Sequence, residues 1–129
     1  MIAVIDASVI IAHLRGEPGG EAFLDAMDEG SAISAVNAAE VVKRMRLNGA
    51  TDEQIQRQMK RLQPLIVGFD YMHLVHYIAT LPHAKRANLS LADCACLATA
   101  KHLRLPALTA DKAWAEIAGD VGVEVVVVR

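Results

Sequence analysis

The chain opens with the stretch MIAVIDASVIIAHL, residues 1–14. Ile2 to Ile5 form an apolar run of strand length that ends at Asp6, and Ser8 to Leu14 continue with apolar residues at helical spacing. The stretch therefore predicts a short strand, one carboxylate at its end and then a helix. In α/β sheets ligands bind at the carboxyl ends of the strands, which makes Asp6 the first candidate site residue.

The rest of the chain repeats this alternation of strands and helices. Apolar runs predict further strands at residues 32–33, 65–67, 107–109 and 121–128, the last of the continuous kind found in buried sheets. Helical spacing and capping signals, among them a capping box that begins at Thr51, predict helices at about 20–29, 35–48, 51–63, 70–81, 90–103 and 111–118. Pro82 ends one of these helices and a basic loop follows at 83–88. The alternation indicates a three-layer α/β/α sandwich with a central, mostly parallel sheet, and we expect residues 1–129 to form one domain.

Composition and charge limit the classes of protein to which this chain can belong. The 129 residues are 53% hydrophobic and only 4% aromatic, which favours a core of Ala, Val, Leu and Ile. No apolar run reaches membrane-spanning length and residues 1–14 lack the features of a signal peptide, so we expect a cytoplasmic protein with no membrane partner. The net charge of −2 argues against a global positive field for nucleic acid. Cys94 and Cys96 lie two residues apart on an expected helix, which points their side chains to different faces and forbids an easy disulfide. We therefore expect buried free thiols that act as small hydrophobic side chains.

Three carboxylates stand alone in long uncharged stretches. Asp6 is the only charged residue among 1–14, Glu40 among 30–42 and Asp93 among 87–100. An ionised carboxylate in apolar surroundings is costly unless a proton, an ion pair or a metal compensates it. Asp111 also follows an expected strand, on the side of the sheet where the strands end. We therefore expect four acids to converge on a cation.

Two of these acids also have an ordinary interpretation as helix caps. Asn37-Ala-Ala-Glu40 and Ser90-Leu-Ala-Asp93 both match a capping box. Caps are usually solvated, however, and Asp6 ends a strand where no cap is needed. Converging carboxylates without a cation would repel one another, whereas Mg²⁺ or Mn²⁺ takes oxygen ligands of this kind.

Four segments of the chain form a specific combination: MIAVIDAS, ISAVNAAEVV, LSLADCACLATA and LPALTADKAW. Together they resemble the PIN-domain ribonucleases, in particular the VapC-type toxins of bacterial toxin–antitoxin pairs. The resemblance implies a PIN-like fold and an Mg²⁺- or Mn²⁺-dependent endoribonuclease. It also implies catalytic and metal-binding roles for the acidic quartet Asp6, Glu40, Asp93 and Asp111, of which the family varies the fourth most. The family's small hydroxyl positions, which support a bound water or metal ligand, correspond to Ser8 and Thr109.

The same resemblance implies three partners. These are an RNA substrate, a small antitoxin protein whose peptide obstructs the acidic pocket, and a second copy of the chain in a homodimer. Because the net charge is negative, RNA must be held by local basic residues. The best candidates are Lys85, Arg86 and Lys112, because their segments lie next to Asp93 and Asp111 in sequence. The helix that bears Lys43 and Arg44 is the alternative path for the RNA.

Three other interpretations stay open. An aspartyl phosphatase would use Asp6 as nucleophile, but that chemistry normally needs a second acid where this chain has Ser8. A phospho-receiver module would need an acidic pair after the first strand and a lysine after the last, and both are missing. The third is an inactive PIN module that only binds an antitoxin, which a nuclease assay with and without chelator would distinguish. His73 and His76 complete no metal-ligand set, so we interpret both as structural.

Overall fold

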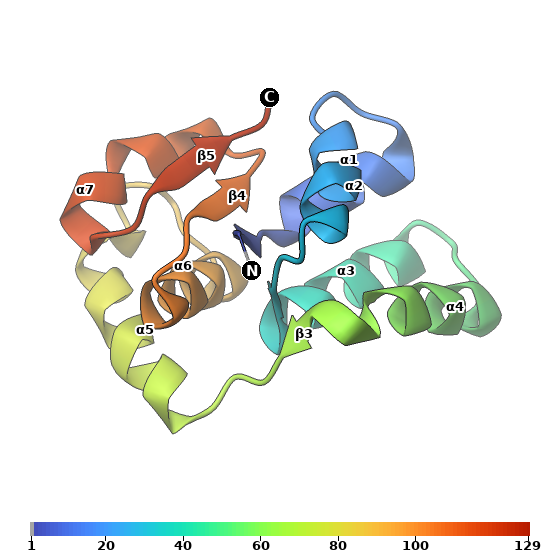
Figure 1. The fold of residues 1–129 in the computed structure, drawn as a ribbon, viewed down its shortest axis with the longest axis horizontal. Helices are drawn as coiled ribbons and strands as arrows, with labels where there is room; N and C mark the ends of the chain where they lie inside the picture. The colour runs from blue at the N-terminus through green and yellow to red at the C-terminus, as the bar shows by residue number, and fades with distance from the viewer. Residues whose placement is uncertain (1) are drawn as a thin grey trace.

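The computed structural model describes residues 2–129, and its centre is a parallel sheet (Figure 1). The strands are β1 (Val4–Ile5), β2 (Ile33–Ser34), β3 (Ile66–Val67), β4 (Ala107–Thr109) and β5 (Val125–Val127). β1, β4 and β5 pair in parallel, as do β2 and β3, and a parallel bridge between Val4 and Ala32 joins the two groups. The strand order is therefore β3-β2-β1-β4-β5, and the order of the strands reverses between β1 and β4.

Helices cover both faces of this sheet. They are α1 (Ala7–Arg15), α2 (Glu21–Asp28), α3 (Ala35–Leu47), α4 (Asp52–Leu62), α5 (Tyr71–Ala84), α6 (Leu91–Leu103) and α7 (Ala118–Val121). Two short 3₁₀ helices span Gln63–Leu65 and Lys112–Glu116. None of the helices in residues 2–129 is long and apolar enough to cross a membrane.

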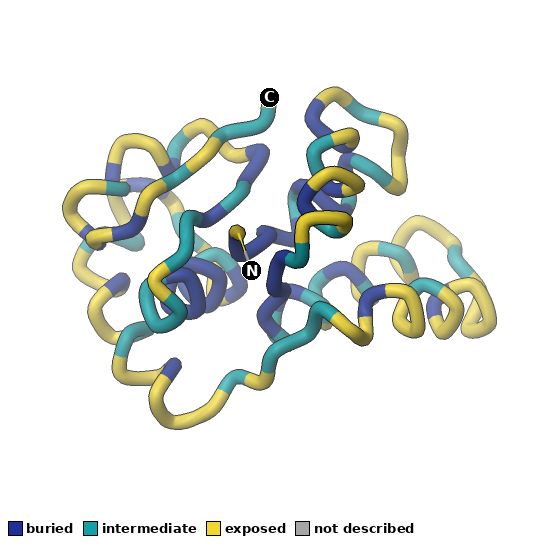
Figure 2. Tube along the Cα trace, in the orientation of Figure 1, coloured by how far each residue is buried: buried dark blue, intermediate teal, exposed yellow. Residues whose placement is uncertain are grey.

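The side chains of β1 show that the molecule has three layers. Val4 and Ile5 point to opposite faces of the sheet, and each joins a different hydrophobic core. Val4 packs in the core that contains α6 and Trp114, whereas Ile5 packs in the core that contains α1, Phe23 of α2 and parts of α3 and α4. α6 is buried along most of its length (Figure 2), and both of its cysteines are buried and unbridged, as predicted. The predicted α/β/α sandwich is confirmed.

α5 differs from the sequence prediction at its C-terminal end. The sequence predicts a helix that stops before Pro82 and a basic loop at 83–88, but α5 continues through Pro82 to Ala84. A proline lacks the N–H that bonds to the preceding turn and usually ends a helix. Here the lost bond falls in the last turn, and α5 packs along α6, which holds the helical path. The basic segment therefore begins at Lys85.

The C-terminal segment also differs from its prediction. The predicted helix at 111–118 is a 3₁₀ helix followed by the short α7, which Gly122 ends with a φ of 73°. The predicted strand at 121–128 is consequently reduced to β5 at the edge of the sheet. Val126 is 40% exposed, so the prediction of a fully buried strand is wrong. A run of valines indicates a strand, but its position in the sheet depends on pairing with residues far away in sequence.

Candidate functional site

Asp6 lies where the order of the strands reverses. It follows β1 directly, beside the end of β4, and only 3% of its surface is exposed. Its Oδ2 accepts a hydrogen bond of 2.6 Å from the Ser8 hydroxyl and one of 2.9 Å from the Thr109 hydroxyl. Both donors bind the same oxygen, and Oδ1 of Asp6 accepts no hydrogen bond from residues 2–129. The structure thus places both predicted supporting hydroxyls against Asp6.

The same two hydroxyls hold the loop that follows β4. Ser8 Oγ accepts a hydrogen bond from the backbone N–H of Ala110 at 3.0 Å, and Thr109 Oγ1 accepts one from the N–H of Asp111 at 3.1 Å. Each hydroxyl therefore donates to Asp6 and accepts from the backbone. This pairing fixes the direction of both O–H groups and the orientation of the Asp6 carboxylate.

Asn37 is a site residue that the sequence interpretation missed. It is fully buried; its Oδ1 accepts a hydrogen bond of 3.1 Å from Ala7 N and its Nδ2 donates one of 3.1 Å to Ala92 O. The helix cap is instead Ser34, whose Oγ accepts from Val36 N, so the alternative interpretation of Asn37 as a helix cap is wrong. Asn37 ties the start of α1 to the start of α6 and so fixes Asp6 relative to Asp93. An uncharged polar residue inside an apolar stretch was the available signal.

Glu40 and Asp93 bring two further carboxylates to the same place. Asp93 forms the predicted capping box with Ser90: its Oδ2 accepts from Ser90 N at 2.8 Å, and Ser90 Oγ accepts from Asp93 N at 3.2 Å. Glu40 lies in the second turn of α3, since that helix begins at Ala35, whereas the capping box read from the sequence would place it in the first turn. Asp6, Glu40 and Asp93 line one cavity of about 350 Å³.

The three carboxylates repel one another in this cavity. Burial raises the pKa of Asp6 to about 7; the Ser8 hydroxyl opposes this rise, and the charges of Asp93 and Glu40 add to it. Burial also raises the pKa of Glu40, and the charge of Asp93 adds to the effect. The pKa of Asp93 is likewise raised by burial, against its hydrogen bonds from Ser90. A cation among these groups would stabilise all three in the ionised form.

Asp111 lies outside the cavity, at the edge of this acidic cluster. Its side chain is exposed, and Oδ1 caps the following 3₁₀ helix by accepting a hydrogen bond of 3.0 Å from Ala113 N. It is not among the residues that line the cavity, yet its charge raises the pKa of Asp93. The structure therefore brings three of the four predicted acids together and places the fourth nearby.

The donor set fits a hard divalent cation that is held partly through water. Within residues 2–129, no three His, Cys, Asp or Glu side chains are close enough to bind one ion together. Mg²⁺ does not need three, because it commonly binds one or two carboxylates and keeps several waters. The cavity offers the free Oδ1 of buried Asp6 and further carboxylate oxygens, with neither His nor Cys in its lining. All-oxygen ligands favour Mg²⁺ or Mn²⁺ over zinc.

The basic residues selected from the sequence differ from those that line this cavity. Lys85, Arg86 and Lys112 do not line it, and Arg86 forms an ion pair with Asp120. The basic residues that do line the cavity are Arg15, Arg44 and Arg129. The basic residues of the cavity lining thus come from α1, α3 and the C-terminal end of the chain, and not from the segments next to Asp93 and Asp111 in sequence.

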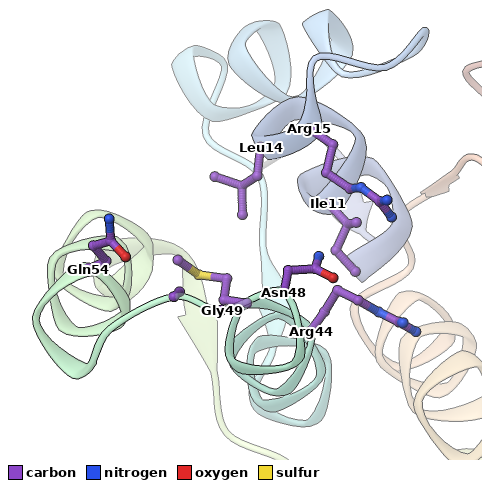
Figure 3. A pocket seen from close by; sticks show the side chains of 9 residues that line it. Ile11, Leu14, Arg15, Arg44, Asn48, Gly49 and Gln54 are labelled. Atoms are coloured by element: carbon purple, nitrogen blue, oxygen red, sulfur yellow. The ribbon is translucent and has the colours of Figure 1, made fainter.

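A second cavity of about 490 Å³ adjoins the acidic one (Figure 3). It lies between α1 and α3 and reaches Gln54 of α4, with Leu14 on one wall. Ile11, Arg15 and Arg44 line both cavities. Figure 3 shows the side chains of Arg15 and Arg44 pointing to the same side, away from Gln54. A largely apolar groove thus leads to the acidic cavity past two arginines.

Comparison with known proteins matches this chain to one family. Residues 3–120 match the PIN domain. A comparison with curated proteins finds no significant match.

Solved structures are similar along almost the whole chain. FitAcB from Neisseria gonorrhoeae is 25% identical with a TM-score of 0.70 and 96% of each chain covered. A toxin–antitoxin complex from Klebsiella pneumoniae is 24% identical with a TM-score of 0.71 and 98% of each chain covered. VapBC-1 from nontypeable Haemophilus influenzae is 17% identical with a TM-score of 0.73 and 98% of each chain covered. The last two likenesses concern the fold alone.

Proposed function

Because the chain belongs to the PIN domain family, we propose that it is a metal-dependent endoribonuclease and the toxin of a toxin–antitoxin pair. One observation carries this proposal. Three carboxylates with raised pKa values line a single cavity at the point where the strand order reverses. Such an arrangement is costly for an empty structural site and suits a site that binds a cation and a phosphodiester.

In this proposal, Asp6 and Asp93 would hold Mg²⁺ or Mn²⁺, and Glu40 and Asp111 would bind it through waters or hold a second ion. The bound ion would supply Lewis-acid polarisation of the phosphodiester and a lower pKa for a bound water. Ser8 and Thr109 keep the Asp6 carboxylate in one orientation by donating to Oδ2. Glu40 is half-buried with a raised pKa, which suits it to accept the proton of the attacking water. This route leaves 3′-hydroxyl and 5′-phosphate ends, because it needs no ribose 2′-hydroxyl nucleophile.

The activity is tested by incubating the purified chain with total bacterial RNA. We expect cleavage with Mg²⁺ or Mn²⁺, loss of cleavage in excess chelator and recovery when the metal is restored. Sequencing of the new ends should show 5′-phosphates. Cleavage that survives the chelator, ends with 2′,3′-cyclic phosphate, or hydrolysis of phosphomonoesters without cleavage of RNA would each contradict the proposal.

We further propose that a segment of a small antitoxin protein occupies the groove of Figure 3. The groove is largely apolar and leads to the acidic cavity, so one bound peptide could fill the first and obstruct the second. The structure from Klebsiella pneumoniae that shares this fold is a toxin–antitoxin complex, so a small antitoxin is the partner to test first. Since the proposed substrate is cellular RNA, we place the protein in the cytoplasm.

We also propose that the chain forms a homodimer through α5. Six large apolar side chains on this helix are exposed: Tyr71, Met72, Leu74, Val75, Ile78 and Leu81. No Asp, Glu, Lys or Arg interrupts residues 71–84, whereas exposed Asp70 precedes the helix and exposed Lys85 follows it. In a symmetric dimer with the two α5 helices antiparallel, Asp70 of each copy would lie near Lys85 of the other. This charge complementarity favours a second copy over an unrelated partner.

Ile78→Glu should convert the dimer to a monomer, because it places a charge in the middle of the buried apolar face. Ile78 is 64% exposed in the single chain, so the substitution should leave the fold intact. Leu47→Glu is the matched control, since Leu47 is 66% exposed but lies at the end of α3. Sedimentation velocity at micromolar concentration measures the mass. A monomeric wild type, or equal masses for the two variants, would argue against this interface.

A further inference from the structure

The acidic cavity has a basic rim. Asp6 at its floor is buried and Glu40 and Asp93 are half-buried, whereas the lining arginines are exposed. The four lining acids are Asp6, Glu17, Glu40 and Asp93, and the three lining bases are Arg15, Arg44 and Arg129. The formal charge of the lining is therefore −1, and a divalent cation on the floor would change it to +1. An RNA strand at this site would then meet positive charge in two places, at a cation on the floor of the cavity and at the guanidinium groups of its rim.

Two of the rim arginines are held by one carboxylate. Glu17 forms an ion pair with Arg15, whose Nε lies 3.2 Å from a Glu17 carboxylate oxygen, and accepts a hydrogen bond of 2.8 Å from an Arg129 Nη. Figure 1 shows the C-terminal end of the chain close to the loop between α1 and α2, which carries Glu17. The single Glu17 carboxylate thus pairs with two guanidinium groups. Each guanidinium keeps N–H groups that can donate to another anion.

Arg44 is the third rim arginine, and its guanidinium is not neutralised by an ion pair. It lies four residues after Glu40 on α3, so both side chains lie on the same face of the helix. No carboxylate of residues 2–129 lies within ion-pair distance of Arg44, although its charge lowers the pKa of Glu40. It also lines the groove of Figure 3 with Arg15, at the junction of the two cavities.

We infer that Arg44, with Arg15 beside it, binds a backbone phosphate of the RNA next to the one that is cleaved. This inference rests on the proposed function and assigns the substrate contact to α3 and the end of α1, and not to Lys85, Arg86 or Lys112. A guanidinium can donate two parallel hydrogen bonds to a phosphate, which a lysine cannot. Arg44 is thus a substrate-positioning residue: it orients the strand and takes no part in the proton transfers.

Arg44→Ala should weaken RNA binding and raise KM by about tenfold, leave kcat nearly unchanged and make the salt dependence of binding shallower by about one unit of log–log slope. Lys43→Ala is the matched control, since Lys43 is the adjacent residue, carries the same charge and is exposed outside both cavities. Arg44→Lys should recover only part of the loss. Binding to single-stranded RNA is measured by filter retention in Ca²⁺, where little cleavage is expected, and cleavage is measured in Mg²⁺.

The two measurements separate this inference from the proposed activity. Equal effects of Arg44→Ala and Lys43→Ala on RNA binding, with Mg²⁺-dependent cleavage intact in the wild type, would overturn the role of Arg44 and leave the nuclease proposal standing. A specific loss of RNA binding in Arg44→Ala, with no cleavage by the wild type, would support the role of Arg44 and contradict the nuclease proposal. A larger effect from Lys85→Ala with Arg86→Ala would move the RNA path to the sequence-predicted residues.

Discussion

Asp93→Asn should reduce RNA cleavage at saturating Mg²⁺ by at least about 100-fold. The substitution removes one of the carboxylate charges that face Asp6 and Glu40 in the cavity, and with it a proposed metal ligand. An asparagine oxygen can still accept the hydrogen bond from Ser90 N, so the start of α6 should keep its cap. The effect should therefore appear in the single-turnover cleavage rate without a loss of folded protein.

Two further substitutions make this result specific. Asp25→Asn is the matched control, because Asp25 is exposed on α2 and lies outside the acidic cavity, and its variant should cleave like the wild type. Asp111→Asn should have an intermediate effect of about tenfold, since Asp111 influences Asp93 only from the edge of the cavity. Cleavage at the wild-type rate by Asp93→Asn would show that this carboxylate is only a helix cap.

The sequence could predict those parts of the fold that depend on local patterns. The apolar run before Asp6, the helical spacing after it and the capping signals at Thr51 and Ser90 each act within a few residues, and the structure shows each as expected. The resemblance to PIN domains is also confirmed, because residues 3–120 match that family. Local patterns are reliable where neighbouring residues alone determine the conformation.

The remaining features depend on contacts between distant residues. Asn37 bonds to Ala7 and Ala92, which are 30 and 55 residues away, and no pattern around residue 37 reveals such partners. Arg129 reaches the acidic cavity by pairing with Glu17, 112 residues away. A sequence pattern can show that a polar residue is unusual for its surroundings, but only the fold shows which groups satisfy it.

Asp6 should make the metal-free protein less stable as the pH rises. Its pKa is raised from 3.8 to about 7 in the folded state, mainly by burial. Between these values the folded protein binds more protons than the unfolded chain, so stability falls with rising pH, and the full cost is present above about pH 7. Asp6→Asn removes this cost and keeps an oxygen that can accept the O–H bonds of Ser8 and Thr109. In chelator, the variant should be more stable than the wild type by about 2 to 4 kcal/mol at pH 8 and nearly equal at pH 4.

Denaturant unfolding of the wild type and Asp6→Asn at pH 4, 6 and 8 in chelator measures the difference in their free energies of unfolding. The same measurement at pH 8 in millimolar Mg²⁺ tests the effect of the metal. Mg²⁺ should stabilise the wild type, because an ion bound only by the folded state shifts unfolding by mass action, and should stabilise Asp6→Asn much less. Thr99→Val provides a control for a buried polar change, since Thr99 Oγ1 donates only to Ala95 O within its own helix. If Asp6→Asn were less stable than the wild type at pH 8 in chelator, the Asp6 carboxylate would be a structural acceptor for the two hydroxyls. If the Asp6 carboxylate destabilises the metal-free protein and stabilises the metal-bound protein, its role is to bind the metal and not to support the fold.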